Sequence, residues 1–227
     1  MEQLLKDRVA IVTGAGRGIG RVIAVAFARQ GASLYLAART ESELNETAEA
    51  CIKVGGNAHV VVTDIAARDQ VENLVSTALR EAGKVDILVN SGGIYGPIGP
   101  TAEIDLAAWT YAVEVNLFGP LYLCAALMPH LMQRRQGKII LLGGGGATAS
   151  LPNFSSYAAS KAGLARLAET LAEELKPFNL SSLLTPSFRR LAKAALVPSR
   201  TRAPEPKVAA GHVASSCSTP RLAAGTV

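Results

Sequence analysis

The chain has 227 residues, of which 49% are hydrophobic and 5% aromatic, and its formal net charge is +5. This length and composition suffice for one α/β domain with a buried sheet, and no second domain is required. No uninterrupted apolar run reaches the ~20 residues that span a bilayer, and the charged start lacks the pattern of a secretory signal. We therefore expect a cytoplasmic protein without a membrane partner.

The positive charge is confined to the last part of the chain. Residues 1–188 carry 16 Lys/Arg and 17 Asp/Glu, whereas residues 189–227 carry 7 and 1. Because the first part has no basic excess, it lacks the positive surface that attracts nucleic acid. We expect a domain over 1–188 that binds no nucleic acid, and a basic Pro/Ser/Ala-rich tail over 189–227 that is poorly ordered.

Cysteine and histidine positions predict no metal site. The three cysteines are odd in number and widely separated, which argues against a disulfide framework and against zinc. The three histidines have no partner at ligand spacing, so we expect ordinary solvated or hydrogen-bonded side chains.

An apolar run near the start is followed at once by a glycine-rich turn and a helical pattern. The run is Val9–Val12, the turn contains Gly14, Gly18 and Gly20, and residues 22–27 have helical spacing. A helix that begins in this way presents free N–H groups and its positive dipole end to a phosphate. Glycines also let a pyrophosphate approach the backbone closely. A glycine turn can be no more than a tight turn, but between a strand and a helix it favours a dinucleotide site.

Further apolar runs bounded by turn residues alternate with helical stretches. After the first run, strands are expected at Ser33–Ala37, Ala58–Val62, Val85–Val89, Lys138–Leu142 and, more weakly, Leu180–Leu184. This alternation predicts βαβ units and a Rossmann-like, doubly wound parallel α/β sheet with helices on both faces. The longest helices are expected at 106–133 and 155–176, and their leucine-rich faces predict a homodimer or homotetramer.

The second predicted strand ends without an acidic residue. A carboxylate at this place in a dinucleotide site would bind the ribose 2′-OH and repel a 2′-phosphate. The chain has Ala38, Arg39 and Thr40 there, and Arg39 and Arg17 can offer planar cations to a 2′-phosphate. We therefore predict NADP(H). NAD(H) remains the alternative if Arg39 stacks on adenine and Arg17 is a solvated loop residue.

The helix predicted at 155–176 carries a phenol and an ammonium four positions apart. Tyr157 and Lys161 share one helix face, so both can point at the same bound molecule. A nearby cation favours the ionised phenol and lowers its pKa, which makes it a usable acid or base. By itself this spacing is more typical of a solvated helix face. The glycine turn earlier in the chain is what makes a catalytic role for the pair a reasonable prediction.

Together these patterns resemble the short-chain dehydrogenase/reductase family over about residues 5–180. Residues 13–20 resemble the family's TGxxxGIG loop, residues 90–93 stand where the family has Asn-Asn-Ala-Gly, and Tyr157 and Lys161 match its YxxxK pair. The resemblance implies coenzyme contacts from Gly14, Arg17, Gly18, Ile19, Gly20, Arg39, Asp64, Ile65, Asn90, Gly92, Tyr157 and Lys161. It also implies that Asn116 is the helix asparagine of the family's proton relay.

The activity implied by the resemblance is hydride transfer between NADP(H) and a small-molecule carbonyl or secondary alcohol. Tyr157 would exchange a proton with the substrate oxygen. Lys161 would bind the nicotinamide ribose and lower the pKa of Tyr157, and Asn116 would anchor a water that links Lys161 to solvent.

The first departure from the family is a missing serine. The family has a serine thirteen positions before the tyrosine, whereas this chain has Gly144. Loss of one donor to a developing oxyanion commonly costs ~10²–10³ in rate. The donor is expected to be replaced by the hydroxyl of Thr148 or Ser150, or by a backbone N–H of Gly144 or Gly145. The alternative is a catalytically impaired nucleotide-binding relative with a regulatory or binding role.

The second departure lies after residue 178, where the carboxy-terminal end is atypical. The family continues with a Pro-Gly turn, a substrate-binding lid and a seventh strand, but this chain has Pro186 followed by Ser187 and no later apolar run. We expect the lid to be missing and the substrate pocket to be open on one side. A shifted reading frame or an alternative exon would produce such a change.

Overall fold

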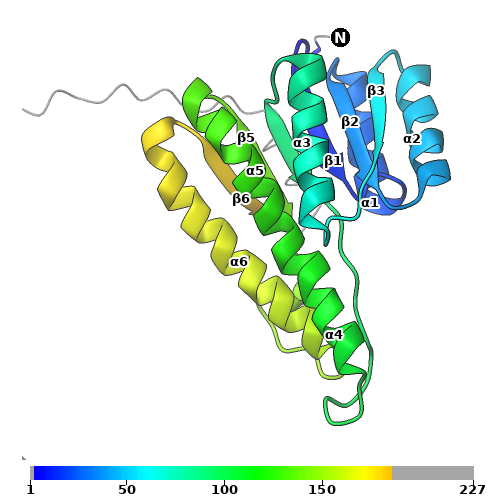
Figure 1. Ribbon diagram of the computed structural model, residues 1–227, viewed down its shortest axis with the longest axis vertical. Helices are drawn as coiled ribbons and strands as arrows, with labels where there is room; N and C mark the ends of the chain where they lie inside the picture. The colour runs from blue at the N-terminus through cyan, green and yellow to red at the C-terminus, as the bar shows by residue number, and fades with distance from the viewer. Residues whose placement is uncertain (1–2, 186–227) are drawn as a thin grey trace, which may run out of the picture.

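Six parallel strands form one sheet in the order β3-β2-β1-β4-β5-β6 in a computed structural model that describes residues 3–185 (Figure 1). The strands are β1 (Val9–Thr13), β2 (Ser33–Ala38), β3 (Asn57–Val62), β4 (Ile87–Asn90), β5 (Lys138–Leu142) and β6 (Ser181–Thr185). The helices are α1 (Gly18–Arg29), α2 (Glu41–Lys53), α3 (Arg68–Ala82), α4 (Leu106–Val113), α5 (Gly119–Arg134) and α6 (Ser155–Leu175). The predicted doubly wound parallel sheet is confirmed, with each strand within two residues of its expected start.

The strand order places a switch point between β1 and β4. The chain begins at the centre of the sheet and moves outward to β3, then returns to pair β4 with β1 and moves outward to β6. In open parallel sheets the loops after two such strands separate at their carboxyl ends, which leaves a crevice for a ligand. The glycine turn after β1 and the residues after β4 meet at this crevice.

Two buried clusters cover the two faces of the sheet. On one face, α3, α5 and α6 pack against residues such as Ile11 and Leu88. On the other face, α1 and α2 pack against Val12 and Val89. Because successive side chains of a strand point to opposite faces, strands buried on both sides become uninterrupted apolar runs. These runs are the signal by which the sequence predicts them.

The first long helix is continuous but not uniform. α4 passes into α5 through a π-helical turn at Glu114–Phe118, which contains the buried Asn116. Within the described residues, the combined segment Leu106–Arg134 is long and apolar enough by length and composition to cross a membrane. Here it packs against α3 and α6 and supplies part of the core. The π-helical turn is the feature that matters for the site, since such turns often mark functional positions.

The leucines of the two long helices are mostly core residues. Six leucines of these predicted faces are at most 5% exposed, namely Leu123, Leu127, Leu131, Leu164, Leu171 and Leu175. Leu121 is 38% exposed. The apolar surface that these helices leave for another subunit is therefore smaller than the sequence predicts, because α3 and the sheet already cover most of it.

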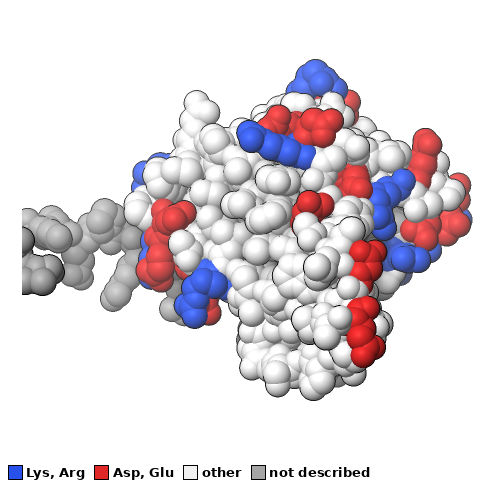
Figure 2. All heavy atoms as spheres, turned by 60° about the horizontal axis from the view of Figure 1, so that its bottom comes forward, with Lys and Arg blue, Asp and Glu red and all other residues white. Residues whose placement is uncertain are grey.

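Charged side chains are unevenly distributed over the lower end of the molecule in Figure 1. Figure 2 looks toward this end and shows charges over the upper, right-hand and left-hand parts of the view, with a broad uncharged area toward the lower centre. The predicted boundary at 188, the tail over 189–227, and Pro186 with Ser187 lie outside the described residues.

Candidate active site

The turn between β1 and α1 depends on glycine at two positions. Gly14 and Gly18 have φ angles of +63° and +57°, in the left-handed region that favours glycine. A Cβ on Gly14 would also lie 2.7 Å from the backbone nitrogen of Gly92, because the loops after β1 and β4 touch there. α1 has no acidic residue in its first turn, so its positive dipole end stays available to an anion.

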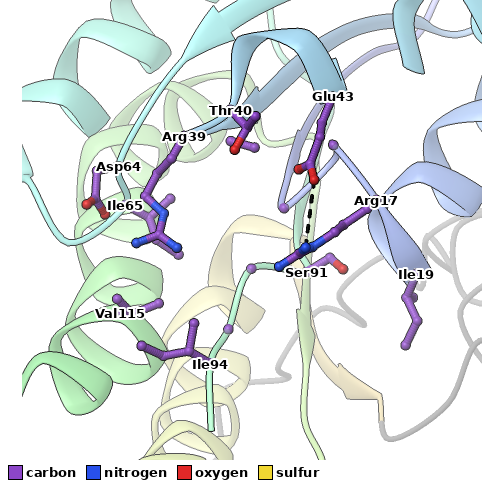
Figure 3. A pocket seen from close by; sticks show the side chains of 15 residues that line it. Arg17, Ile19, Arg39, Thr40, Glu43, Asp64, Ile65, Ser91, Ile94 and Val115 are labelled. Atoms are coloured by element: carbon purple, nitrogen blue, oxygen red, sulfur yellow. Dashed lines mark ion pairs between the residues drawn. The ribbon is translucent and has the colours of Figure 1, made fainter. Parts of the chain in front are cut away.

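A cleft of about 280 Å³ lies beside this turn and is lined by loops from four strands (Figure 3). Seven of the predicted coenzyme residues line it: Gly14, Arg17, Ile19, Arg39, Asp64, Ile65 and Gly92. Gly18 and Gly20 shape the turn instead, and Gly20 lies against the carbonyl of Gly14. The structure thus brings the predicted dinucleotide residues of four separate loops to one cleft.

Asn90 connects the two sides of the switch point. Its Oδ1 accepts a hydrogen bond of 2.7 Å from the Thr13 hydroxyl, and both side chains are fully buried. Its Nδ2 has no hydrogen-bond partner within residues 3–185. A buried donor without a partner is rare in proteins, and Asn90 itself does not line the cleft.

A chain of hydrogen bonds closes one end of the cleft. Arg39 Nη1 donates to the Tyr111 hydroxyl at 2.8 Å, and this hydroxyl donates to Asp64 Oδ2 at 3.1 Å. Burial, followed by the neighbouring Asp64, raises the pKa of Tyr111, so its hydroxyl keeps its proton. Tyr111 is on α4, Arg39 follows β2 and Asp64 follows β3. The sequence did not predict a role for Tyr111.

An unpredicted carboxylate lines the same end. Glu43, in the first turn of α2, forms an ion pair of 3.7 Å with the largely exposed Arg17 (Figure 3). This end of the cleft therefore has two arginines and two carboxylates, Glu43 and Asp64. The sequence signal for Glu43 is its place in the turn that follows the end of β2, where a ribose would lie.

The opposite end of the cleft leads to Tyr157 and Lys161 on α6. Gly93 lines the cleft, and a Cβ added there would lie 3.4 Å from Lys161 Nζ and 3.0 Å from Asn116 Oδ1. Lys161 is 4% exposed, and its Nζ donates a 2.9 Å hydrogen bond to the Leu142 carbonyl. Lys161 is therefore buried next to the cleft wall, whereas Tyr157 on the same helix is partly exposed.

The direction of the pKa shift of Tyr157 differs from the expectation. Burial, and secondarily Tyr95, raises the pKa of Tyr157, while burial lowers the pKa of Lys161 to about 8. Lys161 Nζ lies 5.9 Å from the centroid of the Tyr157 ring and donates to the Leu142 carbonyl instead of the phenol. Lys161 is not among the groups that shift the pKa of Tyr157 here, so the expected lowering by the lysine stays a prediction.

Asn116 holds the loop that follows β4. Its Oδ1 accepts from Ile94 N at 2.9 Å, and its Nδ2 donates to Ile94 O at 2.7 Å and to Ser160 Oγ at 3.1 Å. Both functions of the amide are therefore used within the protein. The water relay through Asn116 remains a prediction. The observed hydrogen bonds hold the loop after β4, which forms the cleft wall next to Lys161.

Gly144 lies directly beneath the hydroxyl of Tyr157, which overlaps the position that a Cβ would take. Neither Thr148 nor Ser150 forms a hydrogen bond to Tyr157 in the described part of the chain. Of the expected replacements for the missing serine, the backbone of Gly144 is thus the group that the structure places beside the phenol.

Comparison with known proteins identifies the class and the family. The doubly wound sheet and the cleft at its switch point are those of a dinucleotide-binding fold. The short chain dehydrogenase family model matches residues 8–184. The chain belongs to the short-chain dehydrogenase/reductase family, a family of oxidoreductases.

Two curated relatives show the extent of the similarity. The chain is 38% identical over 174 residues to a short chain dehydrogenase of Pseudocercospora fijiensis, covering 76% of this chain and 56% of that protein. It is 33% identical over 171 residues to 11-beta-hydroxysteroid dehydrogenase-like 3 of Arabidopsis thaliana, covering 75% and 55%. The chain therefore spans a little over half the length of these relatives.

Solved structures in the family contain nicotinamide coenzymes. A metagenomic short-chain oxidoreductase in complex with NADP has a TM-score of 0.82 and 29% identity, covering 86% of this chain and 93% of that one. Carveol dehydrogenase from Mycobacterium avium in complex with NAD has a TM-score of 0.76 and 25% identity, covering 79% and 70%. Both coenzymes thus occur among the similar structures.

Proposed function

We propose that this protein is an NADP(H)-dependent oxidoreductase that interconverts a carbonyl and a secondary alcohol, with Tyr157 as the proton donor and acceptor. One observation carries the proposal: the cleft that holds the open amino terminus of α1 and two arginines is also lined by Gly93, which lies against Lys161 on the helix that carries Tyr157. This arrangement fits an anionic dinucleotide at one end and a proton-transferring pair at the other.

The residues present fit NADP(H). The glycine turn and the start of α1 would hold the pyrophosphate, and Arg39 and Arg17 would hold the 2′-phosphate. Asp64 and Ile65 would contact the adenine, and Lys161 the nicotinamide ribose. When bound, the coenzyme supplies the hydride or takes it up. The carboxylate of Glu43 opposes a 2′-phosphate, which is why NAD(H) remains the alternative.

Proton transfer favours carbonyl reduction. Because burial raises the pKa of Tyr157, its hydroxyl stays protonated at neutral pH and can donate to a substrate oxygen that gains negative charge. Alcohol oxidation requires the phenolate, which this environment disfavours. The buried Lys161, held by the Leu142 carbonyl, keeps a cation next to the ring from which the proton leaves.

The substrate is proposed to be a neutral small molecule. Tyr95, Ile98 and Leu106 are large apolar side chains between 59% and 69% exposed, on the loop after β4 and at the start of α4. Figure 2 shows the uncharged area at this end of the molecule. Such a surface binds an apolar carbonyl compound more readily than an organic acid. We further propose a cytoplasmic homodimer or homotetramer that contacts through α5 and α6.

The second candidate is a catalytically impaired nucleotide-binding protein. It is favoured by Gly144, which leaves no side-chain hydroxyl at the position where the family has a serine. The two candidates predict the same coenzyme binding and differ only in turnover.

The test compares the wild-type protein with Tyr157→Phe. NADPH binding is followed by nucleotide fluorescence, and turnover is followed on a panel of ketones and quinones. Phenylalanine removes the proton and leaves the cleft intact, so turnover is expected to fall by ~10³-fold while NADPH affinity changes only a few fold. Retained turnover in the variant would refute the role of Tyr157. NADPH binding by the wild type with no oxidation across the panel would support the impaired relative.

A further inference from the structure

Gly144 lies so close to Tyr157 that a side chain at this position would collide with the phenol. It follows β5 in an extended conformation, with φ 174° and ψ 173°, which any residue adopts without strain. A Cβ built there would overlap the Tyr157 hydroxyl and lie 3.0 Å from Cζ and 3.5 Å from Cε1, and these are its three nearest atoms. The space that a side chain would need at this position is therefore taken by the phenol of Tyr157.

The phenol is also confined from another side. The Tyr95 ring packs on the Tyr157 ring with centroids 4.9 Å apart and an interplanar angle of 51°, and Phe154 packs edge-on against Tyr95 at 5.7 Å. The hydroxyl end of Tyr157 thus lies between an aromatic cluster and the bare backbone of Gly144. A methyl group at residue 144 would displace it by roughly 1 Å to restore ordinary contact distances.

The same short segment also holds the second member of the pair. Lys161 Nζ donates to the carbonyl of Leu142, two residues before Gly144. The end of β5 therefore fixes the Lys161 amine through the Leu142 carbonyl, and it leaves space for the Tyr157 phenol at Gly144.

We propose that Gly144 is a positioning residue for Tyr157, and that its lack of a side chain sets where the proton-donating hydroxyl lies. The inference rests on the proposed function. It reverses the meaning of the difference from the family, because a serine at residue 144 would move the phenol rather than restore a lost donor. The reaction centre of this chain is built around glycine.

The first experiment uses two variants and one matched control. Gly144→Ala and Gly144→Ser each add a Cβ that meets the phenol, whereas a Cβ in Gly145→Ala meets no atom within 4 Å and the backbone N–H is kept. Displacement of a reacting group by ~1 Å can cost ~10² in rate, so kcat/KM is expected to fall by about that factor in both residue-144 variants. NADPH affinity, and the kcat/KM of Gly145→Ala, should stay within a few fold of wild type.

The pH profile separates positioning from general damage. Displacing the hydroxyl from Gly144 changes the burial that raises its pKa, so the basic limb of carbonyl reduction should shift in Gly144→Ala and stay in place in Gly145→Ala. An unchanged profile with unchanged kcat/KM in this variant would overturn the proposal. Turnover by Gly144→Ser above that of the wild type would overturn it as well, since serine would then act as a restored donor.

A second measurement does not depend on turnover. Urea unfolding of wild type, Gly144→Ala, Tyr157→Phe and the double variant forms a double-mutant cycle. Because the hydroxyl is the atom that overlaps the added Cβ, Gly144→Ala should cost less stability in the Tyr157→Phe background. Additive effects would contradict the inferred contact. If the wild type proved inactive on every substrate, the proposed function would fail while this cycle would still decide the role of Gly144.

Discussion

Lys161 places a cation where burial disfavours charge. The side chain is 4% exposed, donates a hydrogen bond to a backbone carbonyl, and has a pKa lowered to about 8 from an ordinary 10.5. Removing an ammonium group from water is costly unless a charge partner offsets the loss. A side chain retained under these conditions is typical of a functional site, where stability is lower for the sake of chemistry.

This cost predicts that Lys161→Met stabilises the fold at neutral pH. The free energy of unfolding at pH 7 should rise by ~1–2 kcal/mol, after allowance for the lost hydrogen bond to Leu142, although turnover should be lost. Below pH 8 the lysine is charged in both states, and only the folded state carries the desolvation cost. Between about 8 and 10.5 the folded state loses the proton first, so wild-type stability rises and the advantage of the variant shrinks.

Urea unfolding at pH 7 and at pH 10 measures this difference. Lys53→Met is the control, because Lys53 is 77% exposed on α2 and its replacement removes no buried charge. A variant that is less stable than wild type at pH 7 would show that the bond to Leu142 outweighs the burial of the charge.

At the scale of elements, the site depends on where α4 lies relative to the sheet. Apolar runs and the glycine turn predict all six strands and the phosphate end of the cleft, because these are local patterns. The chain Arg39–Tyr111–Asp64 joins segments 25 and 47 residues apart and has no local signal. The contact between Gly144 and Tyr157 likewise depends on the angle at which α6 meets β5. Such features follow from packing and not from a motif.

Tyr111 is expected to support the proposed preference for NADPH. Its hydroxyl accepts a hydrogen bond from the Arg39 guanidinium. Arg39 is otherwise exposed, and without this bond its side chain would lose more rotamer freedom when it binds a phosphate. Tyr111→Phe should therefore lower the ratio of NADPH to NADH affinity by about fivefold and leave kcat nearly unchanged. The loss should fall on NADPH, since NADH lacks the 2′-phosphate.

Fluorescence titration with both nucleotides measures this ratio. Tyr122→Phe on α5 is the matched control, because it removes the same atom from a tyrosine that does not hydrogen-bond Arg39 in the described part of the chain. An unchanged ratio in Tyr111→Phe would mean that Arg39 is oriented without Tyr111, or that it takes no part in choosing the coenzyme.

At the scale of the molecule, the parallel topology brings every functional segment to one edge. The glycine turn, the ends of β2 to β5 and the start of α6 reach this edge from positions between residues 14 and 161. The opposite ends of the strands carry a structural group, in which the buried Asp86 forms ion pairs with Arg8, Lys84 and Arg134. Chemistry and anchoring are thus placed at opposite ends of the same sheet.

The exposed apolar residues near the start of α5 are the expected contact between subunits. Phe118 and Leu121 are 40% and 38% exposed on neighbouring turns, beside the partly buried Tyr122. If another subunit covers this face, a carboxylate in Leu121→Glu would be buried without a partner and would prevent association. Light scattering after gel filtration should then give an oligomer for the wild type and a monomer for the variant.

Ile52→Glu is the control for this prediction. It changes an exposed apolar residue of α2 and should keep the wild-type mass. If Leu121→Glu and the wild type had the same mass, the subunits would not associate through this face of α5. A single buried carboxylate is sufficient to disrupt an interface built on so small an apolar surface.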